Sequence, residues 1–222
     1  MTGTAPTTGT AGTTRTTRTT GTNVARWARW ARWARSGIPL LGAVFALAGC
    51  GDNDPAPGGP LGRCGQVTRV AEEPALHVTP GQAIGWSSNP PATGRHYPAW
   101  AGWNRSYSLL ARGYWLHNAE HGGVVLLHNC PDGCAADVEA LLALVREQPR
   151  DGQCSGSVRN RILVVADPDL PPQTRFAAVA WGAYYAATCL DPEALGSFIA
   201  SHYARGPEDL CGDGLALGGA PI

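Results

Sequence analysis

The second half of the chain carries a regular pattern of apolar and polar residues that predicts strands and helices. Residues 123–129, "GVVLLHN", form an apolar, β-branched run that predicts a buried strand. Residues 136–148 predict an amphipathic helix, because one helical face would collect Val138, Leu141, Leu142 and Val145. Residues 161–167, "RILVVAD", predict a second buried strand.

The run that follows, residues 175–187, fits either a helix or a strand by its pattern alone. A Pro-Pro turn precedes it and Asp191-Pro192 follows it, and this punctuation favours one strand. Residues 191–203 predict a helix, because Asp191 suits the N-cap and Pro192 suits the first helical position.

The first half of the domain, residues 64–121, is rich in Pro, Gly, Asn and aromatic residues and has no helical period. We therefore expect an α+β fold. A mostly antiparallel sheet would carry two helices on one face, preceded by this Pro/Gly/aromatic-rich irregular half. A ferredoxin-like topology would require the irregular half to supply a further strand.

The N-terminal part of the chain differs from the rest in composition. Residues 1–23 are almost entirely Thr, Gly, Ala and Arg and predict disorder. "ARWARWARWAR" (25–35) is typical of a cationic membrane-interface helix or of the positive region of an export signal, and we favour the signal. The apolar run that follows is shorter than the about 20 residues needed to span a bilayer.

This apolar run ends in Leu-Ala-Gly-Cys, which resembles a bacterial lipobox. Residues 1–49 are therefore expected to be a disordered N-region plus a lipoprotein signal. Cys50 would be the lipid-modified first residue of the mature protein and would anchor it to the membrane. Residues 50–63 predict a flexible tether, 64–211 a single globular domain, and 212–222 a flexible tail.

The charge balance argues against a nucleic-acid partner. Six of the 17 basic residues precede Cys50, whereas all 17 acidic residues follow it. The mature chain would thus carry 17 − 6 = 11 basic residues and a formal charge of 11 − 17 = −6. The chain contains no lysine and no basic stripe, so we expect no nucleic acid to bind. A protein partner is not identifiable from the sequence.

The cysteine count predicts an oxidising compartment. Six cysteines remain after Cys50, and an even number in an exported chain favours three disulfides. If residues 161–167 and 175–187 form an antiparallel hairpin, Cys154 should pair with Cys189. The other expected pairs are Cys130–Cys134 and Cys64–Cys211. A zinc site is the alternative for "CPDGC" (130–134).

The stretch "YWLHNAEHGGVVLLH" (114–128) holds the most conspicuous candidate chemistry. His117, Glu120 and His121 fit the His-x-x-Glu-His pattern of inverted zinc proteases, in which two histidines bind the metal and the glutamate activates water. That pattern requires a long helix, whereas the glycines that follow indicate a turn into a strand. A metalloprotease-like hydrolase is therefore the less favoured interpretation.

Two longer stretches resemble a known family. "HVTPGQAIGWSSNPPATGRHYPAW" and "LHNAEHGGVVLL" are similar to the motifs of the bacterial family called domain of unknown function 3105. The resemblance covers about residues 77–208 and ends with "FIASHYARGPE". It implies an exported or membrane-tethered bacterial protein of the cell envelope, but it implies no reaction. Ala92-Thr93 and Ala119 depart from the family pattern, and no motif histidine is lost.

Two classes of function remain open. The first is a lipid-anchored protein that binds zinc or copper through His96, His117, His121 and also His77, with Glu120 as a ligand, a partner of a ligand, or a general base. Copper and zinc both suit several imidazoles in an oxidising compartment. The second is a non-enzymatic envelope binding or assembly module in which these histidines are structural. His128 and His202 lie outside the motifs and are expected to be structural.

Overall fold

The computed structural model describes residues 64–222. The predictions for residues 1–49 and 50–63, including the lipid at Cys50, lie outside the described residues. Within the described part, no helix has both the length and the apolar character that a membrane crossing requires.

A seven-stranded mixed sheet forms the centre of the described domain, in the order β1-β6-β5-β3-β4-β2-β7. The two pairs that involve β4, with β3 and with β2, are parallel, and the other four pairs are antiparallel. The strands are β1 (Gly65–Arg69), β2 (Arg105–Tyr107), β3 (Val124–His128), β4 (Ile162–Ala166), β5 (Phe176–Ala180), β6 (Ala183–Ala187) and β7 (Ala220–Pro221). The fold is thus α+β, as expected, with a mixed sheet.

The segment 175–187 forms two strands rather than the single strand predicted. The chain turns at Trp181-Gly182, and Gly182 has φ +79°, a left-handed conformation that glycine adopts without the steric cost of a Cβ. β5 and β6 then pair as an antiparallel hairpin, with Ala180 opposite Ala183.

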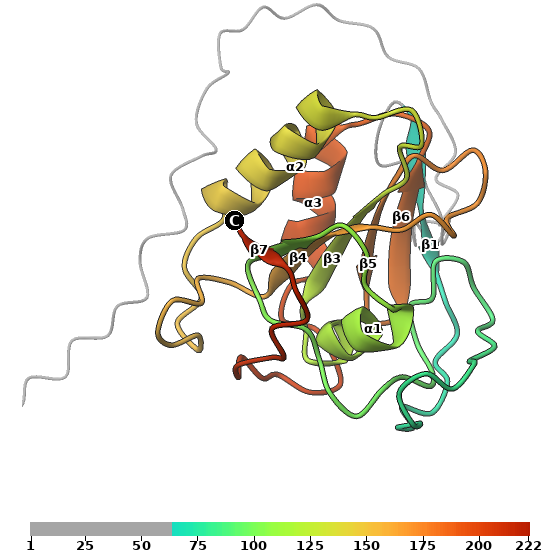
Figure 1. Ribbon diagram of the computed structural model, residues 1–222, viewed down its shortest axis with the longest axis vertical. Helices are drawn as coiled ribbons and strands as arrows, with labels where there is room; N and C mark the ends of the chain where they lie inside the picture. Colours follow the sequence, from blue (N-terminus) through green and yellow to red (C-terminus); the bar gives the residue numbers. More distant parts are fainter. Residues whose placement is uncertain (1–63) are drawn as a thin grey trace, which may run out of the picture. The chain divides into compact units, whose positions relative to one another are not determined.

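Helices cover both faces of the sheet, as Figure 1 shows. α2 (Ala135–Glu147) and α3 (Pro192–His202) pack side by side on one face, as predicted for these two segments. A third helix, α1 (Arg112–Glu120), packs against β3 and β5 on the other face and was not predicted. Asp191 caps α3 as expected, because its carboxylate accepts a hydrogen bond from the Ala194 N–H at 3.2 Å.

Two hydrophobic cores follow from this arrangement. Val124 and Leu126 of β3 point into the core beneath α2 and α3, whereas Val125 and Leu127 point into the core beneath α1. Strands covered on both faces are apolar at successive positions rather than at alternate ones. This explains why "VVLL" and "ILVV" are continuous apolar runs.

The C-terminal residues, predicted to be a flexible tail outside the domain, belong to the sheet. β7 pairs with β2, and Leu215 forms a bridge with Ala101. The Ile222 N–H also donates to the Asn104 carbonyl oxygen at 2.9 Å. The predicted boundary at residue 211 is therefore too early, because backbone hydrogen bonds hold the chain to its end.

The disulfides are Cys64–Cys189, Cys130–Cys134 and Cys154–Cys211. The pair Cys130–Cys134 agrees with the prediction, whereas Cys154–Cys189 and Cys64–Cys211 were wrong. The error lies in the expected hairpin: β4 pairs with β3 and β2, so β3 separates it from β5. Cys64 instead precedes β1, which pairs with β6, and the two cysteines flank this pair. Three disulfides indicate an oxidising, extracytoplasmic compartment.

Candidate metal centre

The motif of residues 117–121 lies at the end of helix α1. His117 and Glu120 are in its last turn and His121 is its C-cap. The motif therefore lies at the end of a helix, which was not expected within residues 64–121, although this helix has only nine residues; the turn into a strand that the following glycines indicated is confirmed. From Trp115 to Glu120 every side chain is buried, so α1 has no polar face and its sequence has no amphipathic period. This is why the pattern of the sequence did not predict it.

Close packing fixes the position of α1. The Asn118 side chain accepts from the Ala101 N–H at 2.9 Å and donates to the Ala101 carbonyl at 2.8 Å, and both groups are buried. After the helix, Gly122 adopts φ +78°, which lets the chain turn directly into β3. A Cβ on Gly123 would collide with the Trp103 ring, so this turn also requires a residue without a side chain.

The irregular first half supplies two further histidines. His77 and His96 form a parallel bridge, in which the His96 N–H donates to Leu76 and the His96 carbonyl accepts from Val78. The bridge sets the two rings edge to face, with centroids 4.9 Å apart. The His77 ring also stacks on His117 at 5.0 Å. Two distant segments of sequence are thereby brought to one point beside α1.

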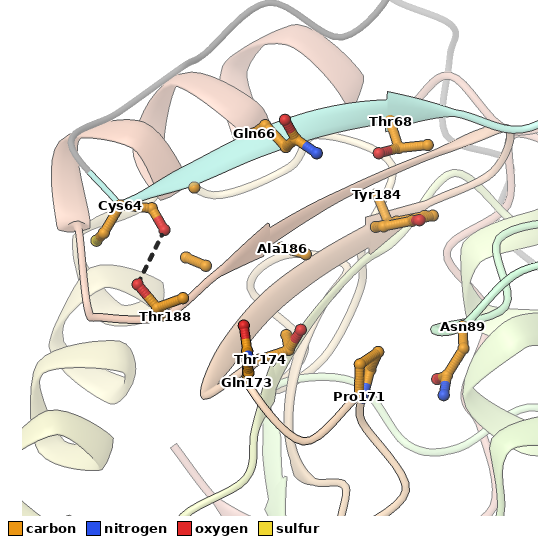
Figure 2. A pocket seen from close by; sticks show the side chains of 12 residues that line it. Cys64, Gln66, Thr68, Asn89, Pro171, Gln173, Thr174, Tyr184, Ala186 and Thr188 are labelled. Carbon is orange, nitrogen blue, oxygen red and sulfur yellow. Dashed lines mark hydrogen bonds between the residues drawn. The ribbon is translucent and has the colours of Figure 1, made fainter.

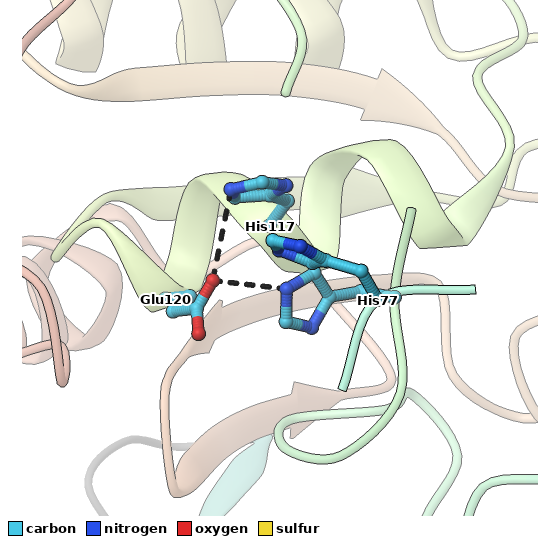
Figure 3. A group of neighbouring side chains, drawn as sticks. His77, His117 and Glu120 are labelled. Atoms are coloured by element: carbon cyan, nitrogen blue, oxygen red, sulfur yellow. Dashed lines mark ion pairs between the residues drawn. The ribbon is translucent and has the colours of Figure 1, made fainter. Parts of the chain in front are cut away.

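Glu120 lies at the centre of this group. Its Oε2 is 2.9 Å from His96 Nε2 and 3.6 Å from His117 Nε2. Figure 3 shows the Glu120 carboxylate facing this group of imidazoles, with His77 beside His117 and the ion pairs of Glu120 as dashed lines. One ligand atom each from His77, His96, His117 and Glu120 lies within 4.8 Å of all the others. All but His77 are buried.

Backbone carbonyls determine which ring nitrogens carry protons. His96 Nδ1 is 2.9 Å from the Gly94 carbonyl oxygen, and His117 Nδ1 is 2.6 Å from that of Tyr97. A carbonyl oxygen only accepts, so each Nδ1 is an N–H donor, and Nε2 of the neutral ring keeps its lone pair. Both Nε2 atoms are near the Glu120 carboxylate, which has only lone pairs to offer. The arrangement is repulsive unless a proton or a cation lies between them.

Burial decides the protonation of His117. It lowers the pKa of this imidazole to about 4, because the charged form loses its hydration. The ring is therefore neutral near pH 7. Burial alone would raise the pKa of Glu120, but the surrounding His96, His117 and His121 outweigh it and lower this pKa below its ordinary value. A carboxylate beside neutral imidazoles is a combination typical of a transition-metal site.

His121 extends the cluster toward the surface. Its Nε2 is 3.0 Å from His117 Nε2 and 3.1 Å from Oε2 of Glu208. Burial lowers the pKa of His121, and the Trp100 ring covers it at 4.4 Å. A second set of potential ligands consists of Glu120, His121 and Glu208. Glu208 was not among the predicted site residues, although it ends the stretch "FIASHYARGPE" and so lay within the family resemblance.

The structure thus brings together every histidine proposed as a ligand, and Glu120. The other two histidines lie outside the cluster. His202 bonds to the Phe198 carbonyl within α3, at 3.0 Å. His128, at the end of β3, is near the sulfurs of Cys130 and Cys134, and the disulfide between those two leaves no thiolate to bind a metal.

A buried arginine supports the outer part of the cluster and was also missed by sequence reasoning. The side chain of Arg161 is 1% exposed and donates to the His121 carbonyl at 3.0 Å. It also pairs with Asp151 and Asp209. Lone arginines at the start of a strand carry no sequence signal that distinguishes a buried cation from a solvated one.

A pocket lies elsewhere, against β1 and β6, and is drawn in Figure 2. Its lining includes Gln66, Thr68, Thr174 and Tyr184 and contains neither histidine nor carboxylate. It therefore offers no metal ligand and is separate from the histidine cluster.

Comparison with known protein families gives a match. The family model described as a protein of unknown function (DUF3105) matches residues 77–212, which include all of the cluster. No curated protein and no solved structure matches the chain.

Proposed function

The chain belongs to the DUF3105 family, whose description assigns no activity, and we propose from its site that it binds a transition-metal ion, zinc or copper. His77, His96 and His117 supply imidazole nitrogens, and Glu120 supplies a carboxylate oxygen as the fourth ligand. The observation that carries this proposal is the orientation of His96 and His117. Their Nδ1 atoms are held by carbonyls, so both Nε2 atoms are turned toward one carboxylate oxygen of Glu120.

A metal ion resolves this arrangement better than a proton does. His96 Nε2 is buried, and within residues 64–222 it faces Glu120 Oε2 at 2.9 Å as an ion pair. A divalent cation would accept all the lone pairs at once, and the backbone carbonyls already orient the rings as the outer partners of metal ligands do. Neutral imidazoles and one carboxylate suit zinc or copper rather than calcium or magnesium.

The protein would act outside the cytoplasm, attached to a bacterial membrane. The three disulfides support an oxidising compartment. The Leu-Ala-Gly-Cys sequence supports lipid attachment at Cys50. Replacing Cys50 with Ala should abolish the incorporation of radiolabelled palmitate and leave the precursor uncleaved. Equal labelling of the variant and the wild type would refute the anchor.

Metal analysis of the purified full-length protein tests the proposal. Wild type should retain zinc or copper after dialysis, whereas His96→Ala and His117→Ala should each retain at least one ion per chain fewer. His202→Ala is the matched control, because it removes a histidine outside the cluster and should retain the wild-type amount. Equal metal in all four proteins would assign the histidines a structural role, as in an envelope binding or assembly module. Circular dichroism and the thermal midpoint verify that each variant is folded.

Hydrolysis is a second candidate function, favoured by one observation: the His-x-x-Glu-His motif does lie on a helix. Glu120 would then act as a general base on a metal-bound water. In that case Glu120→Gln would abolish hydrolysis of a peptide substrate library by the metal-loaded protein. No cleavage by the loaded wild type would exclude this candidate and leave metal binding intact.

A further inference from the structure

We infer that the cluster holds two divalent metal ions rather than one, with Glu120 bridging them and with His121 and Glu208 binding the second ion. This inference rests on the proposed function, because the first ion is the one described above. It adds Glu208, which sequence reasoning did not find, as a ligand.

The potential ligands form two sets that share one residue. His77, His96, His117 and Glu120 make one set, and Glu120, His121 and Glu208 make the other, so Glu120 belongs to both. The two ion pairs of Glu120 with the first set both use Oε2. Its other oxygen therefore remains for a second ion, as in carboxylate-bridged centres, where two ions lie about 3.5–4 Å apart.

His121 is poorly satisfied without a cation. The residue is 2% exposed, and its Nδ1 has no hydrogen-bond partner anywhere in residues 64–222. Its Nε2 lies 3.0 Å from one acceptor, His117 Nε2, and 3.1 Å from another, Glu208 Oε2. A single Nε2–H proton cannot serve both acceptors. A metal ion bound between His121 and Glu208 would accept the lone pairs of both residues.

Glu208 is held in place by its backbone rather than by its side chain. Its N–H donates to the Glu120 carbonyl at 3.0 Å, and nearby the Ala204 N–H donates to Gly122 at 2.8 Å. The backbone of Gly206 lies so close to Glu120 that a Cβ there would collide with the Glu120 carbonyl. The backbone thus places the Glu208 side chain beside His121. That side chain is 50% exposed. The second ion would therefore lie beside a half-exposed carboxylate, and it would keep positions open for water.

The Glu208→Gln variant tests the second ion independently of the first. It should not disturb the fold, because it keeps the backbone hydrogen bond and the size of a half-exposed side chain. Its control is Glu193→Gln, which changes an acidic residue in the first turn of α3. Full-length protein is stripped with a chelator and titrated with Co²⁺, and visible absorption is recorded. Elemental analysis then follows after gel filtration.

The wild type and Glu193→Gln should bind two ions per chain, and Glu208→Gln and His121→Ala should bind one. If wild type binds a single ion and Glu208→Gln is unchanged, the second site is refuted while the proposed function stands. If wild type and Glu208→Gln both bind two ions, the second ion lies elsewhere and this assignment is refuted. If wild type binds none, the proposed function fails, and the second ion fails with it.

Discussion

Replacing Arg161 with Met should destabilise the domain more than any exposed charge replacement, because it leaves buried acceptors without their cation. The guanidinium donates to Asp151 Oδ2 through Nε at 3.0 Å and to the His121 carbonyl at 3.0 Å. The Arg161 side chain is 1% exposed and that of Asp151 is 10% exposed. Removing one partner of a buried ion pair costs about 3–5 kcal/mol. Asp209 is 49% exposed and adds at most about 1 kcal/mol.

Arg146→Met provides the matched control, because Arg146 and Glu139 form an ion pair on α2 in which both side chains are largely exposed. Its loss should cost no more than about 1 kcal/mol. The assay is urea denaturation of both variants and the wild type at pH 7 with the disulfides oxidised. If Arg161→Met lowers the free energy of unfolding no more than Arg146→Met does, the buried network contributes little and the argument fails.

Acid should reduce the difference in the free energy of unfolding between the wild type and Arg161→Met. Burial alone raises the pKa of Asp151, but the Gln153 N–H, the Tyr203 hydroxyl and Arg161 together lower it below its ordinary value. A carboxyl whose folded pKa is lowered stabilises the fold above its unfolded pKa of about 4, and this contribution disappears as pH falls through the folded pKa. The wild type therefore loses the contribution below about pH 4. In the variant, protonation relieves an unpaired buried carboxylate, so the two stabilities should converge below that pH. A deficit that stays constant from pH 7 to pH 3 would contradict this linkage.

Three further predictions concern the covalent structure and the packing beneath the cluster. Peptide mapping without reduction should recover Cys64–Cys189, Cys130–Cys134 and Cys154–Cys211, and a Cys154–Cys189 peptide would contradict the strand order. Asn118→Ala should lower the free energy of unfolding in urea by about 2–4 kcal/mol, because it leaves the buried N–H and C=O of Ala101 unpaired; a loss below 1 kcal/mol would refute this. Gly206→Ala should lower the thermal midpoint because its Cβ collides with the Glu120 carbonyl, whereas Gly196→Ala, which has room inside α3, should raise stability by about 0.5–1 kcal/mol. Equal effects of the two glycine variants would show that the collision is relieved without cost.

Local patterns predicted the strands and helices of the second half because burial gives each of them a recognisable pattern of apolar residues. β3, β4, α2 and α3 agree with the predicted segments to within about one residue at each end. The failure over 175–187 has a local cause as well. "AVAWGAYY" is apolar throughout, so the turn at Gly182 is marked by one glycine and nothing polar.

The strand order could not be obtained from such patterns, because it depends on contacts between distant segments. Consecutive strands often pair, which favoured a hairpin of 161–167 with 175–187. In the structure β3 occupies that place, with β4 parallel on one side and β5 antiparallel on the other. The wrong strand pairing placed Cys154 beside Cys189 in the prediction. Cys64 and Cys211 then remained as the third pair, so one topological error produced both wrong disulfides.

The candidate site was predictable to the extent that its residues stand in motifs. His96, His117, His121 and Glu120 were found there, and His77 was added because it begins the first motif. Glu208 was missed because a glutamate in a Gly-Pro loop is usually a solvated charge, and only its backbone bond to Glu120 and its ion pair with His121 place it at the site.

The inner and outer parts of the cluster depend on different supports. The proposed inner ligands are positioned by two contacts close to them. These are the backbone bridge between His77 and His96 and the hydrogen bond between the Asn118 side chain and Ala101. The outer ligand Glu208 lies in the segment 204–211, which is tied at one end by Gly122 and at the other by the disulfide of Cys211 with Cys154. Between these two attachment points, the Arg161 guanidinium donates hydrogen bonds to both Asp209 and the His121 carbonyl. Reduction of this disulfide would remove a covalent tie three residues from Glu208, whereas His77, His96 and His117 lie in other segments of the chain. The proposed second ion, and not the first, would therefore be the one whose binding depends on an oxidising compartment.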